Sequence, residues 1–350
     1  MTATASTTAT MTAAVYRSFG TPEVVRVEQI ARPVPRRNEI LVRVHASTVS
    51  VADHRARSLD IPSGLRLMAA AGLGVFRPKR RVLGMDVAGV VEAVGEDVTR
   101  FSVGDEVIGL TGARFGGHAE YVTLKQDGPV TPKPRTMGFE EAVTLVFGGV
   151  TARGFLNHVS IKPGARVLVN GASGAVGTAA VQLAKELGAH VTGVTSFVNR
   201  ELVTSLGADR VIDYTAEDFT AEPIEYDVIL DCVGNAPFPK VRHLIRPGGA
   251  LLLVIADLKG IVAARWQSRR SGKLVTADVG SAPATDLAYL VDLAERGRYR
   301  AVIDRTYDLD DIVDAHRYVD TGRKKGNVVL RIPSPASPTT SPITSQGRTS

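Results

Sequence analysis

Three glycines at a spacing of three residues, Gly171, Gly174 and Gly177, are the part of the sequence best suited to bind a phosphate group. They follow an aliphatic run at residues 167–169 and precede a segment whose apolar residues recur at the spacing of one helix face. The first amides of a helix have no intrahelical partner and carry positive partial charge, so a diphosphate can bind there. This order predicts a phosphate site, although a turn that only packs a helix on a sheet is the alternative.

The glycines match the dinucleotide-binding pattern GxGxxG only in part, because alanine stands at the position of its first glycine. Gly174 would let the backbone approach the phosphates, and Gly177 would let the helix pack closely on the sheet. We therefore expect the cofactor's diphosphate to lie against residues 172–177. These are Ala172, Ser173, Gly174, Ala175, Val176 and Gly177.

The residue expected to read the adenosine ribose lies 19 positions after Gly177, at Ser196. No Asp or Glu stands between residues 194 and 200. A carboxylate about 4 Å from a 2′-phosphate would be repelled by about 4 kcal/mol at an effective dielectric constant near 20. The sequence therefore favours NADPH over NADH, with Arg200 and Asn199 as ligands of the 2′-phosphate. An ordinary solvated arginine is the alternative for Arg200.

The elements around these residues indicate two domains. Residues 136–280 alternate strands with helices, which predicts an α/β domain with a doubly wound parallel sheet. Residues 11–135 read as short strands of a β-rich domain, and residues 138–157 read as a single helix that leads into the first strand of the α/β domain. Residues 281–332 supply two helices, at 286–296 and 309–321, and a last strand at 327–332. Residues 1–10 and 333–350 have the composition of disordered ends.

The β-rich domain is interrupted by a less regular insert at residues 58–81, which ends in the basic run Arg-Pro-Lys-Arg-Arg. Either a mobile flap over a pocket or an inert surface segment fits this pattern. A second basic cluster surrounds Trp266 and contains Arg265, Arg269, Arg270 and Lys273. A solvated rim, or a surface that attracts an anionic cofactor, explains this cluster more simply than nucleic-acid binding does.

The composition limits the class of protein. Hydrophobic residues make up 44% and charged residues 22% of the chain, as in globular proteins. No apolar run reaches the roughly 20 residues of a membrane helix. A single cysteine, Cys232, excludes an internal disulfide and a cysteine-rich zinc site, and it fits a reducing cytoplasm. We therefore expect a cytoplasmic protein without a nucleic-acid or membrane partner.

Several phrases give the chain a resemblance to the zinc-independent quinone oxidoreductases of the medium-chain dehydrogenase/reductase superfamily. The resemblance covers about residues 11–332 and implies a GroES-like catalytic domain followed by a Rossmann nucleotide-binding domain. It also implies a homodimer joined through the nucleotide-binding domains. The matching phrases include VLGMDVAGVVEAVGEDVTRFSVGDEVIG at 82–109, VLVNGASGAVGTAAVQLAKELGAHVTGV at 167–194 and HRYVDTGRKKGNVVL at 316–330.

The sequence departs from the zinc-dependent members of this superfamily. Their Gly-His-Glu motif, which supplies a metal-binding histidine, corresponds here to Gly84-Met85-Asp86. No cysteine lies near residues 47–50, where those enzymes have their first ligand. Catalytic zinc needs about three protein ligands. We therefore expect no metal site and no zinc-polarised mechanism.

The resemblance implies further cofactor contacts, all in a cleft between the two domains. Thr151, Val233 and Gly234 are expected near the nicotinamide, and Tyr214 near the adenosine phosphate. Lys325 and Asn327 are expected to approach the cofactor from the return segment.

The resemblance does not identify a catalytic side chain with the same clarity. Ser50 replaces the asparagine that the family uses in its Asn-Pro-x-Asp phrase, which weakens any substrate contact there. His54 could donate a proton to the reduced substrate, although a histidine on a surface helix is the alternative. Tyr121 and Cys232 read as packed core residues.

Together, these observations predict an NADPH-dependent reductase that transfers a hydride to a quinone or an activated double bond without zinc. Reduction of 2-alkenals or other enones rather than quinones is one alternative. A non-catalytic NADPH-binding protein that responds to redox state is another, from a different functional class.

Overall fold

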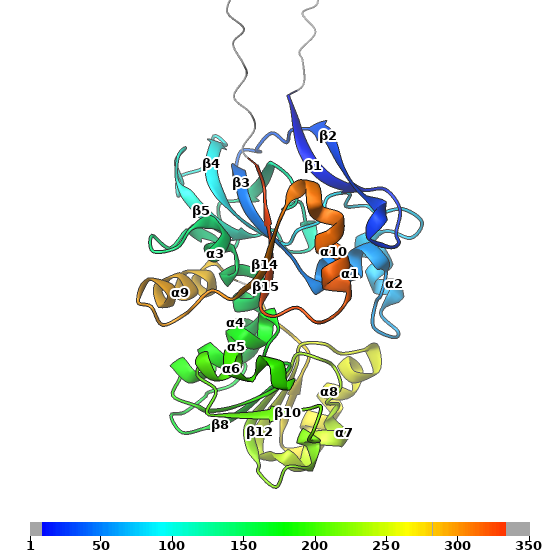
Figure 1. Ribbon diagram of the computed structural model, residues 1–350, viewed down its shortest axis with the longest axis vertical. Helices are drawn as coiled ribbons and strands as arrows, with labels where there is room; N and C mark the ends of the chain where they lie inside the picture. The colour runs from blue at the N-terminus through cyan, green and yellow to red at the C-terminus, as the bar shows by residue number, and fades with distance from the viewer. Residues whose placement is uncertain (1–8, 282, 334–350) are drawn as a thin grey trace, which may run out of the picture.

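The computed structural model describes residues 9–281 and 283–333 (Figure 1). The ends expected to be disordered, 1–10 and 333–350, lie outside these ranges except at Ala9, Thr10 and Pro333. Thr10 begins strand β1 (Thr10–Tyr16), which pairs antiparallel with β2 (Val25–Ala31). The ordered β-rich domain therefore starts slightly earlier than the sequence predicts.

The β-rich domain is built on a seven-stranded sheet with the order β14-β15-β3-β4-β5-β7, in which β6 also pairs with β3. The return segment contributes β14 and β15, so it joins the same sheet as residues 39–132. Most pairs are antiparallel, and β14 with β15 is the parallel exception. The strands are β3 (Glu39–Val49), β4 (Asp86–Val94), β5 (Glu106–Leu110), β6 (Tyr121–Lys125), β7 (Val130–Pro132), β14 (Ile303–Asp308) and β15 (Asn327–Arg331).

The nucleotide-binding domain, in the lower half of Figure 1, has a six-stranded parallel sheet with the order β10-β9-β8-β11-β12-β13. This is the strand order of a doubly wound dinucleotide-binding domain, whose crevice opens between the first and fourth strands along the chain, here β8 and β11. The predicted fold class is confirmed. The strands are β8 (Arg166–Asn170), β9 (His190–Thr195), β10 (Arg210–Asp213), β11 (Tyr226–Asp231), β12 (Ile245–Leu253) and β13 (Leu274–Thr276).

Alternate residues of the central strands enter two separate cores, as expected of strands buried on both faces. Val167 and Val169 of β8 pack with one core, and Leu168 between them packs with the other. The first core also contains residues of α4 (Val150–Leu156), α5 (Ala175–Glu186), α6 (Arg200–Ser205) and α9 (Ala284–Glu295). The second contains residues of α7 (Phe238–Val241) and α8 (Leu258–Ser271).

Four segments depart from the pattern read from the sequence. The single helix predicted at 138–157 is α3 (Phe139–Val143), a π-helical turn (Leu145–Gly149) and α4. The irregular insert contains helix α2 (Arg66–Leu73). The predicted helix at 309–321 is a short 3₁₀ turn followed by α10 (Ile312–Asp320). Strand β14 was not predicted.

Candidate active site

The three glycines between β8 and α5 meet three different requirements. Gly171 has φ +79°, which favours glycine. A Cβ on Gly177 would lie 2.1 Å from the carbonyl oxygen of Gly171, so no larger residue fits there. A Cβ on Gly174 would meet only that same oxygen, at 3.6 Å, and would otherwise point into open space. The open space is where the diphosphate of a dinucleotide would lie, so the loop fits the cofactor.

Helix α5 presents unpaired amides to this space. Gly174 is its N-cap residue, and the amide of Thr178 donates to the carbonyl of Gly174 at 2.8 Å. This is the first backbone hydrogen bond of the helix. The three amides before Thr178, those of Ala175, Val176 and Gly177, therefore have no partner within the helix. They are donors for an anion at the positive end of the helix.

The loop is fixed to the end of β9 through side chains. The Ser173 hydroxyl accepts hydrogen bonds from the Thr195 hydroxyl at 2.9 Å and from the Asn199 amide at 3.2 Å. The same Asn199 amide donates to the Ser196 hydroxyl at 3.2 Å. Ser173, Ser196 and Asn199, predicted separately, are therefore brought together. Their contacts hold the glycine loop against the segment that follows β9. The Asn199 side chain is buried instead of facing a ligand.

The expected adenosine end of the site carries an exposed cation and exposed apolar groups. Arg200 begins α6, and its exposed guanidinium forms no hydrogen bond or ion pair within the described ranges. The backbone amide of Tyr214 donates to the carbonyl of Thr195, so Tyr214, which is 60% exposed, lies beside the end of β9. Phe197 and Val198 are also largely exposed there. This arrangement offers apolar surface to an adenine ring and a free cation to a phosphate.

A carboxylate that was not predicted from the sequence lies at this end. Asp213, the last residue of β10, pairs across the sheet with Thr195. Hydrogen bonds from the side chain and backbone of Thr215, with a further one from the backbone of Phe197, lower the pKa of Asp213. It is therefore ionised near the ribose-reading position. A search limited to residues 194–200 could not find it, because it lies on the neighbouring strand.

The loop after β11 forms the other side of the crevice. The buried Asp231 carboxylate accepts from the amides of Val233 and Gly234, both at 3.0 Å, and from Asn170 of β8 at 2.8 Å. Val233 is half exposed and lies against Gly171. Asp231 thus holds Val233 and Gly234 beside the glycine loop, a positioning role that the sequence analysis did not assign.

The return segment contacts the glycine loop directly. The amide of Gly326 donates to the carbonyl of Ser173 at 2.7 Å, and Gly326 forms a β-bridge with Gly174. Lys325 is half-buried, and its backbone amide donates to Asp304 at 2.8 Å. The Asn327 side chain is buried and donates to the carbonyl of Val302, so it is not directed to a ligand.

Lys324 is a further cation at this contact between domains, and the sequence analysis did not select it. Its ammonium donates to the carbonyl of Gly326 at 2.7 Å. Burial lowers the pKa of Lys324 to about 8, and the nearby carboxylates of Asp304 and Asp86 oppose that shift. A lysine with this pKa is cationic at neutral pH and neutral in mild base.

Thr151 lies at the start of α4, on the nucleotide-domain side. Its hydroxyl donates to the carbonyl of Phe147 at 2.7 Å, so the hydroxyl hydrogen of Thr151 is already used in a hydrogen bond. The π-helical turn before it packs tightly on α5, since a Cβ on Gly148 would lie 2.6 Å from the carbonyl oxygen of Ala175. Thr151 is partly exposed and so remains a candidate for contact with the nicotinamide.

The two predicted catalytic side chains both have partners within the protein. Ser50 is the N-cap of α1 (Val51–Ser58) and forms a capping box with Asp53, in which its amide donates to the Asp53 carboxylate at 2.8 Å and its hydroxyl accepts from the Asp53 amide at 3.4 Å. The Ser50 hydroxyl also donates to that carboxylate at 2.6 Å. Asp53 is fully buried and also accepts from the amide of Gly84 at 2.8 Å. His54 contacts Asp320 of α10 at 2.6 Å. These contacts give both side chains partners within the protein, and the catalytic roles of Ser50 and His54 stay predictions.

A second buried carboxylate lies nearby at the start of β4. Asp86 accepts from the amide and hydroxyl of Thr48 at 2.8 and 2.7 Å and lies 3.4 Å from the Ser47 hydroxyl. Burial raises the pKa of Asp86 to about 7, although the hydrogen bonds from Thr48 oppose the shift. Among residues 9–281 and 283–333, no group of three or more His, Cys, Asp or Glu side chains is arranged to hold a metal ion.

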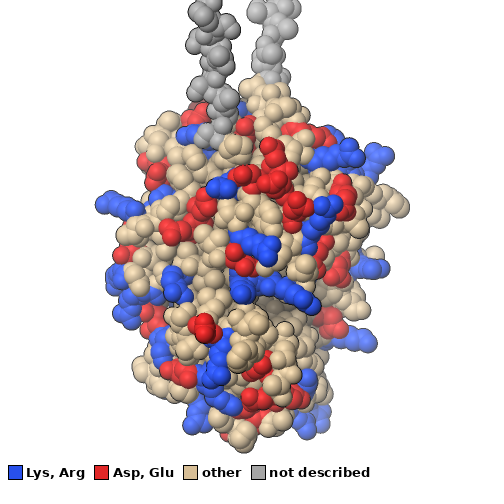
Figure 2. Space-filling view, viewed as in Figure 1, with Lys and Arg blue, Asp and Glu red and all other residues tan. Residues whose placement is uncertain are grey.

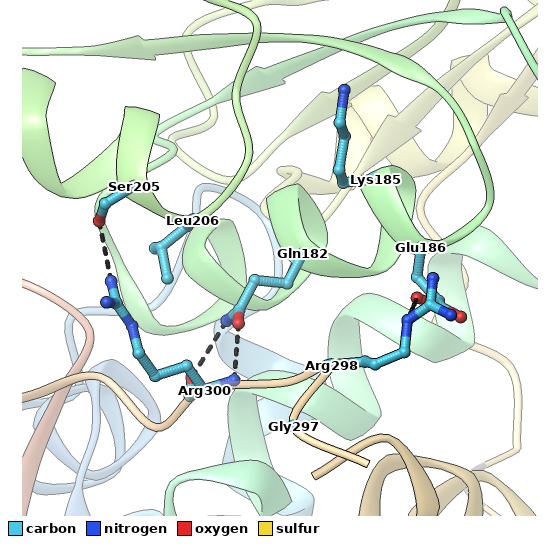
Figure 3. Close-up of a pocket in the computed structure, with 8 residues that line it drawn as sticks. All are labelled: Gln182, Lys185, Glu186, Ser205, Leu206, Gly297, Arg298 and Arg300. Carbon is cyan, nitrogen blue, oxygen red and sulfur yellow. Dashed lines mark hydrogen bonds and ion pairs between the residues drawn. The ribbon is translucent and has the colours of Figure 1, made fainter.

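A shallow pocket of about 410 Å³ at the other end of α5 is not part of this site (Figure 3). Gln182 exchanges two hydrogen bonds with the backbone of Arg300 there, at 2.7 and 3.2 Å. The charged groups already have partners, since Arg298 pairs with Glu186 and Lys185 with Asp209. The pocket therefore lacks a free group for chemistry.

Comparisons with known proteins agree with this architecture. An alcohol dehydrogenase GroES-like domain matches residues 36–135, and a zinc-binding dehydrogenase domain matches residues 206–330. The 2-methylene-furan-3-one reductase of Solanum lycopersicum is 32% identical over 90% of this chain and 77% of its own length. The NADPH-dependent alkenal/one oxidoreductase of Arabidopsis thaliana chloroplasts is 31% identical over 94% of this chain and 82% of its own.

A solved structure, the quinone oxidoreductase from Coxiella burnetii, has a TM-score of 0.83 at 28% identity and covers 93% of this chain and 100% of its own. The glycine loop, the strand order and the domain matches are thus found together in one family of oxidoreductases, which use a nicotinamide cofactor. The chain belongs to the medium-chain dehydrogenase/reductase superfamily, among its quinone oxidoreductase-like members, and the resemblance inferred from the sequence is confirmed.

Proposed function

We propose that this protein is an NADPH-dependent reductase that transfers a hydride to a quinone or to an activated carbon–carbon double bond without zinc. The observation that carries the proposal is the open space over Gly174, at the edge of the sheet where β8 and β11 end and where unpaired amides of α5 point. The names of the relatives, which include an NADPH-dependent alkenal/one oxidoreductase and a quinone oxidoreductase, support both the cofactor and the acceptor class.

The bound nicotinamide supplies the hydride, and the protein supplies position and charge. The amides at the start of α5 would hold the diphosphate. Arg200 would bind the 2′-phosphate, and Tyr214 would lie against the adenosine. Lys324 and Lys325 add positive charge from the return segment, while Val233, Gly234 and Thr151 would border the nicotinamide.

The residues at the positions of the zinc ligands support the part of the proposal that excludes zinc. Met85 stands where the zinc enzymes have a ligand histidine, and the carboxylates of Asp53 and Asp86 already accept hydrogen bonds from the protein. A quinone or enone delocalises the charge that arrives with a hydride, so positioning can suffice without a Lewis acid. The proposal also retains the cytoplasmic location and the homodimer expected from the sequence.

Turnover with a panel of acceptors tests the proposal. Purified protein should consume NADPH faster than NADH in the presence of at least one quinone or 2-alkenal, and treatment with a metal chelator should leave the rate unchanged. The better class of acceptor distinguishes a quinone reductase from an enone reductase. Tight NADPH binding with no turnover on any acceptor would contradict the proposal and favour a non-catalytic NADPH-binding protein.

A further inference from the structure

Two segments of the chain carry positive charge without any carboxylate. Residues 61–85 and 258–277 contain ten Lys and Arg and no Asp or Glu. The rest of the chain therefore has a formal charge of −4, the difference between the total of +6 and this +10. None of the ten forms an ion pair within the described ranges. They are Arg66, Arg77, Lys79, Arg80, Arg81, Lys259, Arg265, Arg269, Arg270 and Lys273.

The same two segments expose large apolar side chains. Seventeen large hydrophobic residues are exposed in the described part of the chain, and eight of them lie in these segments. Four others, at residues 197, 198, 214 and 233, border the proposed cofactor site and have an explanation there. The eight are Leu67, Met68, Val75, Phe76, Leu258, Ile261, Val262 and Trp266.

On α8 the exposed side chains lie mainly on one face of the helix, where apolar residues come first and cationic residues follow. Leu258, Val262 and Trp266 follow one another at intervals of four, and Arg270 continues the row, with its guanidinium 5.2 Å from the Trp266 ring. Apolar residues therefore prevail in the N-terminal half of this face, beside Lys259, and cations prevail in its C-terminal half. Helices that lie in a membrane interface are likewise rich in Lys and Arg and carry Trp and Leu as their apolar residues.

The two segments meet although they belong to different domains. The amide of Leu258 donates to the carbonyl of Ser63 at 3.0 Å. Gly64 packs on the Leu258 side chain so closely that a Cβ at Gly64 would lie 2.7 Å from the Cβ of Leu258. Figure 1 shows α2 above α8 on the same side of the molecule, and Figure 2 shows Lys and Arg side chains projecting from that edge. We call the exposed residues of these two segments the α2–α8 surface. Two of the ten cations are not part of it: the Lys273 ammonium donates to the carbonyls of Arg242 and Ile245, and Arg81 lies beside Tyr16 and Glu28.

We propose that the α2–α8 surface docks the protein on the surface of an anionic lipid bilayer. Apolar side chains would enter the headgroup region, and the cations around them would attract acidic headgroups. No helix in the described residues is long and apolar enough to span a membrane, so the contact is interfacial. This inference goes beyond the proposed reduction and does not depend on the identity of the cofactor. It replaces the expectation from the sequence that the protein has no membrane partner.

Charge argues against a second copy of this chain as the occupant. A two-fold interface places the same patch of both subunits face to face, so the cations of one copy would meet those of the other. Like charges opposed across an interface cost several kcal/mol. A phospholipid surface with acidic headgroups has the complementary sign and accepts apolar side chains as well.

The test uses the full chain and vesicles of phosphatidylcholine with or without phosphatidylserine. Trp266 is the only tryptophan and is 61% exposed, so its fluorescence reports on this surface directly. We expect its emission to shift to shorter wavelength, and the protein to sediment, only with vesicles that contain phosphatidylserine. High salt should weaken both effects. No shift and no sedimentation, or equal binding to pure phosphatidylcholine, would overturn the proposal.

Two double variants separate this surface from general charge effects. Arg269→Gln with Arg270→Gln should lower the partition coefficient at least about tenfold, because each basic residue near an anionic surface contributes roughly a factor of five. The matched control is Arg36→Gln with Arg135→Gln, which removes two exposed arginines outside this surface and should bind like the wild type.

An equal loss in both double variants would contradict the α2–α8 surface as the contact. A shift of Trp266 emission with protein concentration alone would overturn the proposal in favour of self-association. NADPH turnover with a water-soluble acceptor, measured on the same samples, reports on the proposed function separately.

Discussion

The nucleotide-binding and catalytic domains differ in how many of their polar groups already have partners within the protein. On the nucleotide-domain side, the amides at the start of α5 face open space and the Arg200 guanidinium is free within the described residues. On the catalytic-domain side, the buried carboxylates of Asp53 and Asp86 are occupied by the protein's own donors. The first domain offers free donors to a ligand, whereas the buried carboxylates of the second have partners within the fold. We therefore expect the nucleotide-binding domain to hold most of the charged groups of the cofactor.

The largest expected effect would come from filling the open space. Gly174→Val should reduce NADPH affinity at least about 100-fold, or about 2.7 kcal/mol, as measured by fluorescence titration. The fold should tolerate valine, because Gly174 has φ −78° and no close neighbour. Gly138→Val is the matched control, since Gly138 is an N-cap glycine with φ −68° and no neighbour within 4 Å. Equal binding by both variants would contradict the proposed phosphate site.

The next effect concerns the 2′-phosphate. Arg200→Ala should weaken NADPH about tenfold and NADH little, because only NADPH carries the phosphate that a guanidinium would bind. Asp213→Asn should change selectivity in the opposite direction, because it removes a carboxylate from the same loop region. Dissociation constants for both nucleotides test this pair. Equal changes for NADPH and NADH in either variant would refute the corresponding role.

A smaller effect should depend on pH. Lys324 is cationic below its pKa of about 8, so NADPH affinity should fall as pH rises through that value. Lys324→Met should bind NADPH roughly fivefold more weakly near neutral pH and show a flatter profile, since a charge near the diphosphate is lost. Lys324→Arg should keep the affinity and move the decline to higher pH. Titrations across pH check this, and a wild-type profile retained in Lys324→Met would assign the decline to another group.

The smallest effect is expected in the catalytic domain, where the buried carboxylates already have partners within the protein. Ser50→Ala removes an N-cap and a donor to Asp53, so it should lower the free energy of unfolding by about 1 kcal/mol. The turnover number should stay within about twofold of the wild type. Loss of a general acid or base typically costs 10²- to 10⁴-fold in rate. A drop of that size in the turnover number, without a loss of stability, would support the catalytic role predicted for Ser50 from the sequence.

The difference between the two domains also explains which features of the site could be predicted from the sequence. The phosphate loop depends on glycines and on strand and helix periodicity within residues 166–196, so local patterns identify it. Asp213 and Lys324 approach the loop only because β10 lies beside β9 and the return segment crosses between domains. Contacts of this kind join residues far apart in the chain. No local pattern contains them.

Two structural elements escaped prediction for local reasons. Strand β14 has the sequence IDRTYD, in which charged residues interrupt the apolar alternation, and it is an edge strand held by β15. Helix α2 has no side-chain cap at its start and no buried residue, so neither a capping signal nor an apolar stripe directed to the core marks it. Leu67 and Met68 of this helix instead face outward, in the surface proposed to bind lipid.

A crystal structure of the protein with NADPH tests the central claim most directly. We predict diphosphate oxygens within about 3 Å of the backbone amides of Ala175, Val176 and Gly177, a normal hydrogen-bond distance, over the unobstructed face of Gly174. A nucleotide bound elsewhere, or a diphosphate held only by side chains away from the start of α5, would contradict the account.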